Sequence, residues 1–187
     1  MKPYFLSLLF IVPVLAGCQT PVFTYEDPND DPRAVPSVGT VVVLNEDLHF
    51  RVGSSRSYIQ YGVAQPKGGV NTREPYCLFY LYEPSEALKH ERTIQADKFK
   101  VEKSFQAAEF VSIKPLVQAA IFLTGDGDGP SARSLTTTLR LESEAQPQVR
   151  ELRCSVFGEA NLYDFVSINQ MIETLGDVAT LHIPAAN

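Results

Sequence analysis

The sequence contains no tryptophan, only three cysteines and no excess of positive charge. Without tryptophan the chain lacks the broadest aromatic face for stacking against a sugar, which weakens a carbohydrate-binding interpretation. Acidic side chains outnumber lysine and arginine by 22 to 16, and no cluster of basic residues interrupts this balance. Nucleic-acid binding is therefore disfavoured, because a phosphate backbone attracts basic surfaces. Internal repeats are also absent.

What the sequence does have is a distinctive N-terminus. Lys2 is followed by an almost wholly apolar stretch, residues 4–15, and then by the small residues Ala16 and Gly17. A positive residue, a short apolar run and a small-residue boundary are typical of a secretory signal peptide. A transmembrane helix is the poorer interpretation, because a span needs about 20 apolar residues and Pro13 interrupts this shorter run. Residues 1–17 are therefore predicted to be a signal peptide.

The four residues Leu15-Ala16-Gly17-Cys18 resemble the lipobox of bacterial lipoproteins. The resemblance implies a diacylglycerol on the Cys18 thiol, cleavage between Gly17 and Cys18, and acylation of the new amino group. Two or more acyl chains hold a protein stably on a membrane. Gln19 stands where aspartate would favour the inner membrane in enterobacterial-type sorting, which implies the periplasmic face of the outer membrane. The alternatives are an ordinary signal peptide or a disulfide at Cys18.

Residues 18–37 are predicted to form an acidic, proline-rich tether after the lipidated cysteine. Four prolines are spread among four acidic residues and one asparagine here: Pro21, Glu26, Asp27, Pro28, Asn29, Asp30, Asp31, Pro32 and Pro36. Proline removes backbone donors and the carboxylates repel one another, so no packed element is expected. Fully extended, the tether would reach on the order of 60 Å. The alternative is that its first part docks on the domain through Val22, Phe23 and Tyr25.

With Cys18 assigned to lipid, Cys77 and Cys154 remain as a pair. Disulfides form and persist in exported proteins, so this pair is predicted to be bridged. The alternative is two buried thiols or one reactive thiol. The whole chain has a formal net charge of −6. Lys2 is the only charged residue among the first 17, so the chain without them has a net charge of −7.

Residues 38–187 are predicted to form a single, mainly β domain, an antiparallel sandwich or barrel-like fold. Short β-branched or aromatic runs alternate with turn signals along this part of the chain. The predicted strands are residues 38–44, 48–52, 57–63, 76–82, 98–105, 110–113, 119–123, 135–141, 151–157 and 178–183.

One short helix is predicted near the C-terminus. Ser167 and Gln170 have the spacing of a capping box. Apolar residues then recur at helical spacing as far as Leu175, and Gly176 is suited to end the helix.

Candidate chemistry is sparse. The three histidines, His49, His90 and His182, stand far apart, and no zinc, phosphate-loop or serine-hydrolase motif is present. Asp126 and Asp128 lie in a glycine-rich stretch that resembles a calcium loop, but Pro130 and Thr137 fall where an EF-hand needs oxygen ligands. These two aspartates are weak metal candidates, and neither a cofactor nor a metal site is predicted.

An aromatic group is the other candidate for binding: Tyr58, Tyr61, Tyr76, Phe79, Tyr80 and Tyr82. Such a group could form a binding platform for a peptide or sugar. In a strand protein without tryptophan, however, tyrosine and phenylalanine are the obvious residues for packing the core and the sheet edges. Core packing is the favoured prediction for each ring.

The domain that follows the lipobox resembles uncharacterised small lipoproteins of proteobacteria, a resemblance that implies no activity. We therefore predict a membrane-anchored, non-catalytic lipoprotein that works in binding or in envelope assembly and maintenance. Its predicted partners are the membrane, through lipid, and envelope proteins. Two alternatives remain, a periplasmic hydrolase and a carrier of a small ligand or lipid.

Overall fold

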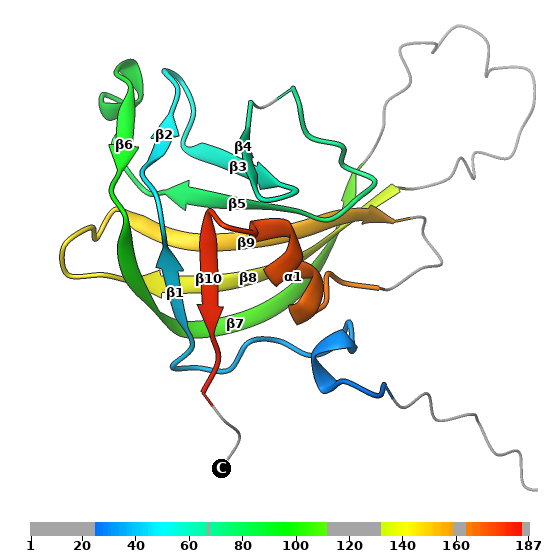
Figure 1. Cartoon of the computed structure of the whole chain (residues 1–187). Helices are drawn as coiled ribbons and strands as arrows, with labels where there is room; N and C mark the ends of the chain where they lie inside the picture. Colours follow the sequence, from blue (N-terminus) through cyan, green and yellow to red (C-terminus); the bar gives the residue numbers. More distant parts are fainter. Residues whose placement is uncertain (1–24, 67, 112–131, 159–163, 185–187) are drawn as a thin grey trace, which may run out of the picture.

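The body of the protein is one antiparallel sheet of eight strands, curled into a half-barrel (Figure 1). In this computed structural model the described residues are 25–66, 68–111, 132–158 and 164–184. The sheet has the strand order β10-β1-β7-β8-β9-β5-β3-β4, and β2 and β6 form a separate two-stranded ribbon. The strands are β1 (Val41–Leu44), β2 (Leu48–Phe50), β3 (Arg56–Gln60), β4 (Val63–Gln65), β5 (Tyr76–Leu81), β6 (Arg92–Ile94), β7 (Asp97–Val111), β8 (Ala132–Glu142), β9 (Val149–Gly158) and β10 (Ala179–His182).

The predicted class, a mainly β antiparallel fold with one short helix near the C-terminus, is confirmed. Of the two predicted arrangements, the barrel-like one is observed. Register shifts between Val101 and Lys103 on β7, and between Tyr80 and Leu81 opposite β9, interrupt the ladders. Such bulges increase local twist and bend a strand, which helps the long central strands to curl.

The observed strands differ from the predicted ones in three ways. The expected strand 57–63 is broken at Tyr61 and Gly62, whose φ values are 56° and 69°. Two successive positive φ values form the tight turn of a hairpin, so β3 and β4 are separate strands. The expected strands 98–105 and 110–113 both fall on one long strand, β7, as far as the structure describes them, and β6 was not predicted. The expected strand 119–123 lies outside the described residues.

The helix α1 (Ile168–Leu175) links the two ends of the curled sheet. It begins as predicted, with Ser167 Oγ accepting from the Gln170 N–H and Gln170 Oε1 accepting from the Ser167 N–H. Its residues contact β10 at one end of the sheet and β3 and β5 towards the other. The Gly62 N–H donates to the carbonyl of Thr174 at 2.9 Å, which joins the β3–β4 turn to the helix.

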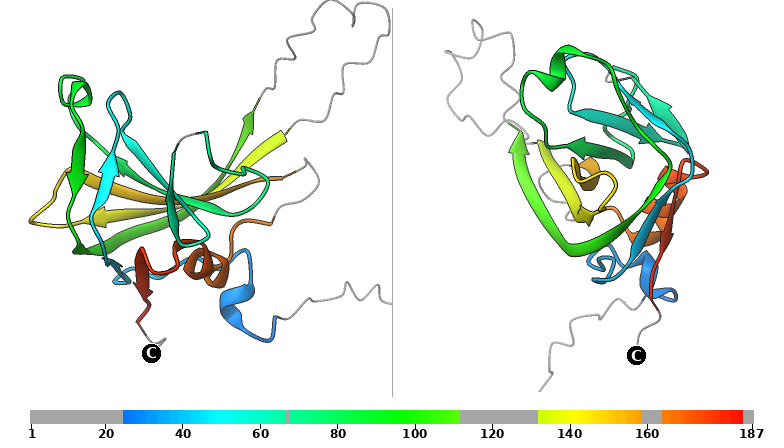
Figure 2. Two further views of the ribbon diagram at one scale, coloured as in Figure 1. Left: turned by 45° about the horizontal axis from the view of Figure 1, so that its top comes forward. Right: turned by 90° about the vertical axis from the view of Figure 1, so that its left-hand side faces the viewer.

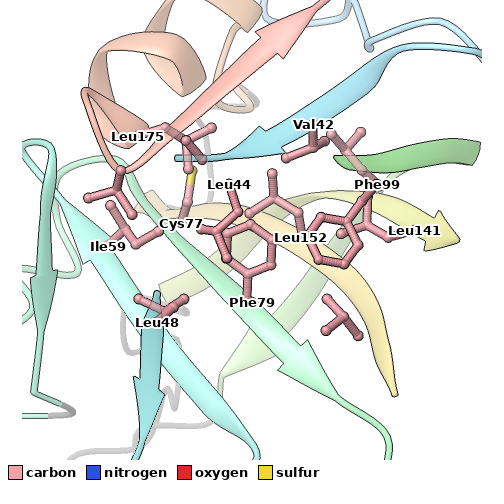
Figure 3. Close-up of a cluster of buried hydrophobic side chains, with 14 of the residues drawn as sticks. Val42, Leu44, Leu48, Ile59, Cys77, Phe79, Phe99, Leu141, Leu152 and Leu175 are labelled. Carbon is pink, nitrogen blue, oxygen red and sulfur yellow. The ribbon is translucent and has the colours of Figure 1, made fainter. Parts of the chain in front are cut away.

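Buried side chains fill the concave side of the half-barrel (Figure 3). Phe79 of β5 and Phe99 of β7 are fully buried, and their ring centroids lie 6.2 Å apart. Each such side chain contributes about 1.5–3 kcal/mol by leaving water. Leu175 of α1 and Leu44 of β1 complete the same cluster. The helix therefore closes the core where the sheet itself remains open.

Part of the predicted tether lies against the domain instead of extending from it. We call residues 27–36 the docked segment; it begins with the short 3-10 helix η1 (Pro28–Asp30), which packs on α1. Asn169 of α1 donates from Nδ2 to the carboxylates of Asp27 and Asp30, at 2.9 and 2.8 Å. These bonds are the physical reason for the difference from the prediction, because they satisfy carboxylates that were expected to repel one another.

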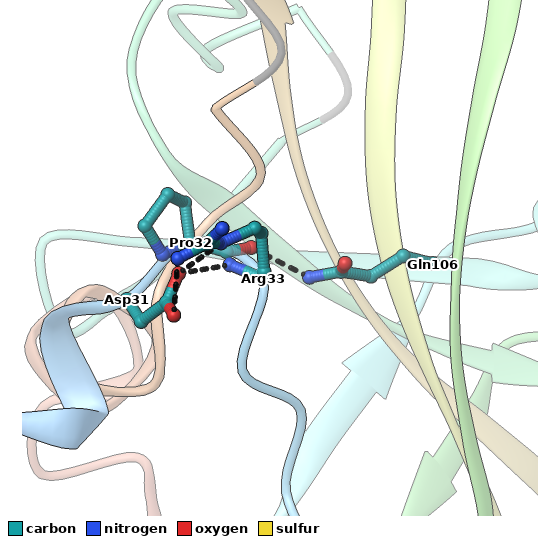
Figure 4. Close-up of polar contacts among 4 residues, drawn as sticks. All are labelled: Asp31, Pro32, Arg33 and Gln106. Atoms are coloured by element: carbon teal, nitrogen blue, oxygen red, sulfur yellow. Dashed lines mark hydrogen bonds and ion pairs between the residues drawn. The ribbon is translucent and has the colours of Figure 1, made fainter. Parts of the chain in front are cut away.

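The second half of the docked segment is held by β7. Gln106 Nε2 donates to the carbonyl of Pro32 at 2.8 Å, and the Asp31 carboxylate accepts from the Arg33 side chain (Figure 4).

The bond from Asn169, followed by the bond from the Asn29 N–H, holds the pKa of Asp27 below its ordinary value of 3.8. A lowered pKa means that docking is favoured above that value and weakens as the pH falls below it.

Candidate functional site

The candidate site is built on two strands that the disulfide joins. Cys77 of β5 and Cys154 of β9 are directly opposite each other, with their Cα atoms 4.0 Å apart, and are bridged. The predicted disulfide is therefore confirmed. Both cysteines are buried on the core face. Because side chains alternate along a strand, their neighbours Leu78 and Arg153 point to the opposite, outer face.

A row of mostly basic residues crosses the outer face of the sheet. Consecutive pairs of this row are register partners on adjacent strands: Arg56 with Tyr80, Tyr80 with Glu151, Glu151 with Arg140, and Arg140 with Lys103. We call these five residues the basic row. Directly opposite residues in a sheet are close enough for their side chains to interact, so the row is a continuous surface across five strands.

The ring of Tyr80 lies between two arginine side chains. The guanidinium of Arg56 lies 5.7 Å from the ring centroid and that of Arg153, which is diagonal to it, lies 5.0 Å away. Both distances are within the range of a cation–π interaction, about 6 Å. Two cations therefore share one aromatic ring.

Glu151 is the only acidic member of the basic row, and its carboxylate is paired with two arginines. Its carboxylate accepts from Arg153 at 2.7 Å and lies 3.9 Å from Arg140 Nε. The Glu151 side chain is 14% exposed, against 59% for Arg140. Arg140 is therefore the more exposed charge of this pair, although the chain as a whole is acidic.

A shallow groove of about 360 Å³ adjoins the basic row. Tyr82, Arg150 and Glu102 line it together with Arg140 and Glu151. Tyr82 follows β5 and is 77% exposed, the most exposed large apolar side chain among the described residues. Tyrosine and arginine are the residue types that dominate binding energy at protein interfaces. The arrangement is thus suited to recognition by charge and stacking.

The predicted aromatic group divides between the core and the surface. Phe79 and Tyr76 are buried, as expected for core packing, and burial raises the pKa of the Tyr76 hydroxyl, against a bond from Ser155 that lowers it. Tyr80 and Tyr82 instead lie on the outer face. Tyr61 is exposed in the β3–β4 turn, where its hydroxyl bonds to Glu74.

The other predicted residues do not converge on a site. His49 Nδ1 lies 2.9 Å from Thr93 Oγ1 on the β2–β6 ribbon. Within the described ranges no group of three or more histidine, cysteine or acidic side chains could hold a metal ion. The weak metal candidates Asp126 and Asp128, and the lipobox residues Gly17 and Cys18, lie outside those ranges.

Comparisons of the chain with known protein families, with curated proteins and with solved structures find no match. In the part of the chain that the structure describes, no helix is both long and apolar enough to cross a bilayer.

Proposed function

We propose that the protein is a lipid-anchored, non-catalytic binding protein of the bacterial cell envelope, held at the periplasmic face of the outer membrane. Its binding surface is the basic row with the adjacent Tyr82, and its partner is an acidic protein surface. The observation that carries the proposal is the Tyr80 ring flanked by Arg56 and Arg153, where a disulfide joins the strands of Tyr80 and Arg153.

Two features support the anchor and the compartment. Leu15-Ala16-Gly17-Cys18 supplies the lipobox pattern directly after an apolar run. The disulfide between Cys77 and Cys154 fits an oxidising compartment outside the cytoplasm, where such bonds persist.

Two features favour binding of a protein over carriage of a small ligand. The concave side of the sheet, as far as the structure describes it, is filled by side chains such as Phe79 and Phe99, whereas a carrier needs an apolar cavity. The basic row, by contrast, presents the three cations Arg56, Arg140 and Lys103 and one paired carboxylate on the outer face of the sheet. An acidic partner is the complement of that charge pattern.

The anchor is tested by the variant Cys18→Ala. We expect it to lose palmitate labelling and to move from the membrane fraction to the soluble periplasmic fraction, because no acyl chain can then attach. A Gln19→Ala variant, which keeps the thiol, should remain labelled. Labelling that survives in Cys18→Ala would overturn the anchor.

The binding surface is tested by photo-crosslinking in living cells. A photoreactive amino acid at position 82 should capture an acidic protein, and the same probe at Ile172, which is exposed on α1, should not. The captured protein is then purified and titrated against the domain. We expect Arg56→Ala with Arg140→Ala to weaken binding by about tenfold or more, with a marked dependence of the association rate on salt.

The control is Lys89→Ala, which removes one positive charge from an exposed residue that is not a member of the basic row. It should leave the affinity unchanged. If the captured protein binds the Arg56→Ala, Arg140→Ala variant as tightly as the parent, the assignment of the binding surface is wrong.

A further inference from the structure

Because the docked segment lies against the domain, less of the chain is free to separate the domain from a lipid on Cys18. Asp27, which bonds to Asn169, is the first residue of the docked segment and stands nine residues after Cys18. A chain of nine residues spans at most about 32 Å. The connecting segment, residues 18–26, therefore reaches about half as far as the 60 Å expected for a free tether.

This length is shorter than the domain. A chain of about 150 residues folds to a radius of gyration of about 15 Å, which corresponds to a diameter of about 40 Å. If the side of the domain opposite Asp27 touched the bilayer, Asp27 would stand roughly 40 Å from the lipid surface. The connecting segment cannot span that distance, so the inverted orientation is excluded.

The elements near the docked segment identify the side of the domain that can face the membrane. η1 packs on α1, and the bonds from Asn169 hold the two together. In all three ribbon views η1 and α1 lie towards one end of the molecule and the β2–β6 ribbon lies at the other (Figures 1 and 2). Val52, in the turn after β2, is exposed at that far end.

We infer that the α1–η1 side of the domain faces the lipid headgroups and that the β2–β6 ribbon points away from them. This inference rests on the proposed lipid anchor at Cys18. The exposed apolar side chains of the facing side include Tyr25 and Ile172, each 42% exposed. Ile172 stands one helical turn after Asn169 and therefore on the same face of α1.

The short connection, and not attraction, imposes this orientation. The α1–η1 side carries the carboxylates of Asp27, Asp30, Glu173 and Asp177. Acidic side chains have no affinity for anionic lipid. The occupant of this side is therefore a zwitterionic headgroup surface that the acyl chains bring close, and the domain without its lipid should not bind vesicles.

The test compares fluorescent labels at Ile172→Cys and Val52→Cys in the acylated protein. Both positions are exposed, and the native pair Cys77 and Cys154 is unavailable for labelling because it is bridged. The protein is reconstituted in phosphatidylethanolamine–phosphatidylcholine vesicles, which are zwitterionic and carry a headgroup nitroxide quencher. We expect several-fold stronger quenching at position 172 than at position 52.

A second variant isolates the length of the connection. An insert of about 20 glycine and serine residues after Thr20 lengthens the connecting segment without touching the docked segment. The difference in quenching should then disappear. The double variant Asn169→Ala, Gln106→Ala, which frees the docked segment, should have the same effect while circular dichroism shows a folded domain.

The outcomes separate the two proposals. A protein that floats with vesicles but is quenched equally at both positions overturns the orientation and leaves the anchor standing. A protein that does not float overturns the anchor and the orientation together. A difference that survives the insert shows that something other than chain length orients the domain, and it also overturns the inference.

Discussion

Replacing Cys77 and Cys154 together by alanine is expected to lower the free energy of unfolding by about 4 kcal/mol. The bridge joins residues 77 positions apart in the sequence, so it removes a large loop entropy from the unfolded chain. In the folded state it also lies within the core cluster, where both cysteines are buried.

The measurement is urea unfolding of the parent, the parent with reductant, and the double variant. The reduced parent and the variant should unfold at similar, lower urea concentrations. Their dependence on urea should be steeper than that of the oxidised parent, because an unfolded chain without the bridge exposes more surface. Coincident transitions for all three samples would contradict the predicted contribution of the disulfide.

The second large effect is expected at Gly176, where α1 ends. We expect Gly176→Ala to lower the free energy of unfolding by about 3 kcal/mol, because two costs add. The residue has φ 51° and ψ −131°, a conformation that side chains strongly disfavour. An alanine Cβ would also lie 2.5 Å from the Cα atom of Gly62. Gly62 cannot withdraw without breaking its hydrogen bond to Thr174.

Gly53→Ala is the matched control for this variant. Gly53 also has a positive φ, 77°, but a Cβ there would meet nothing within 4 Å. It should therefore show the conformational cost alone, about 1 kcal/mol. Both variants are compared with the parent by urea unfolding. Equal losses would mean that the close approach of Gly62 and Gly176 has no energetic consequence.

Local patterns predicted much of the fold because their causes are local. The helix start at Ser167 depends on a hydroxyl and an amide three residues apart, and both bonds are present. The break at Tyr61–Gly62 was missed because Tyr61 adopts a positive φ that tyrosine rarely takes. Packing of the turn against α1 supplies the compensation, and that contact is not visible in the sequence.

The basic row was missed for a different reason. Arg56, Arg140 and Lys103 lie on strands distant in sequence, and only the strand order brings them together. One part of it was accessible, because the predicted bridge between Cys77 and Cys154, if placed between adjacent strands, fixes the register that sets Tyr80 opposite Glu151. The docked segment was missed because its carboxylates bond to Asn169, over 100 residues later.

The docked segment also bears on how the protein avoids self-association. The pairing of β1 with β7 ends at Lys100, although β7 continues to Val111. Beyond that point, the Gly39 N–H donates to the Val101 carbonyl, the Val101 N–H donates to the Thr40 carbonyl, and the Gln106 side chain donates to the Pro32 carbonyl. A free strand margin is a template for another chain's strand. Proline cannot donate a backbone hydrogen bond, so the segment with Pro28, Pro32 and Pro36, which lies beside β7 at Gln106, is a poor partner for another chain's strand.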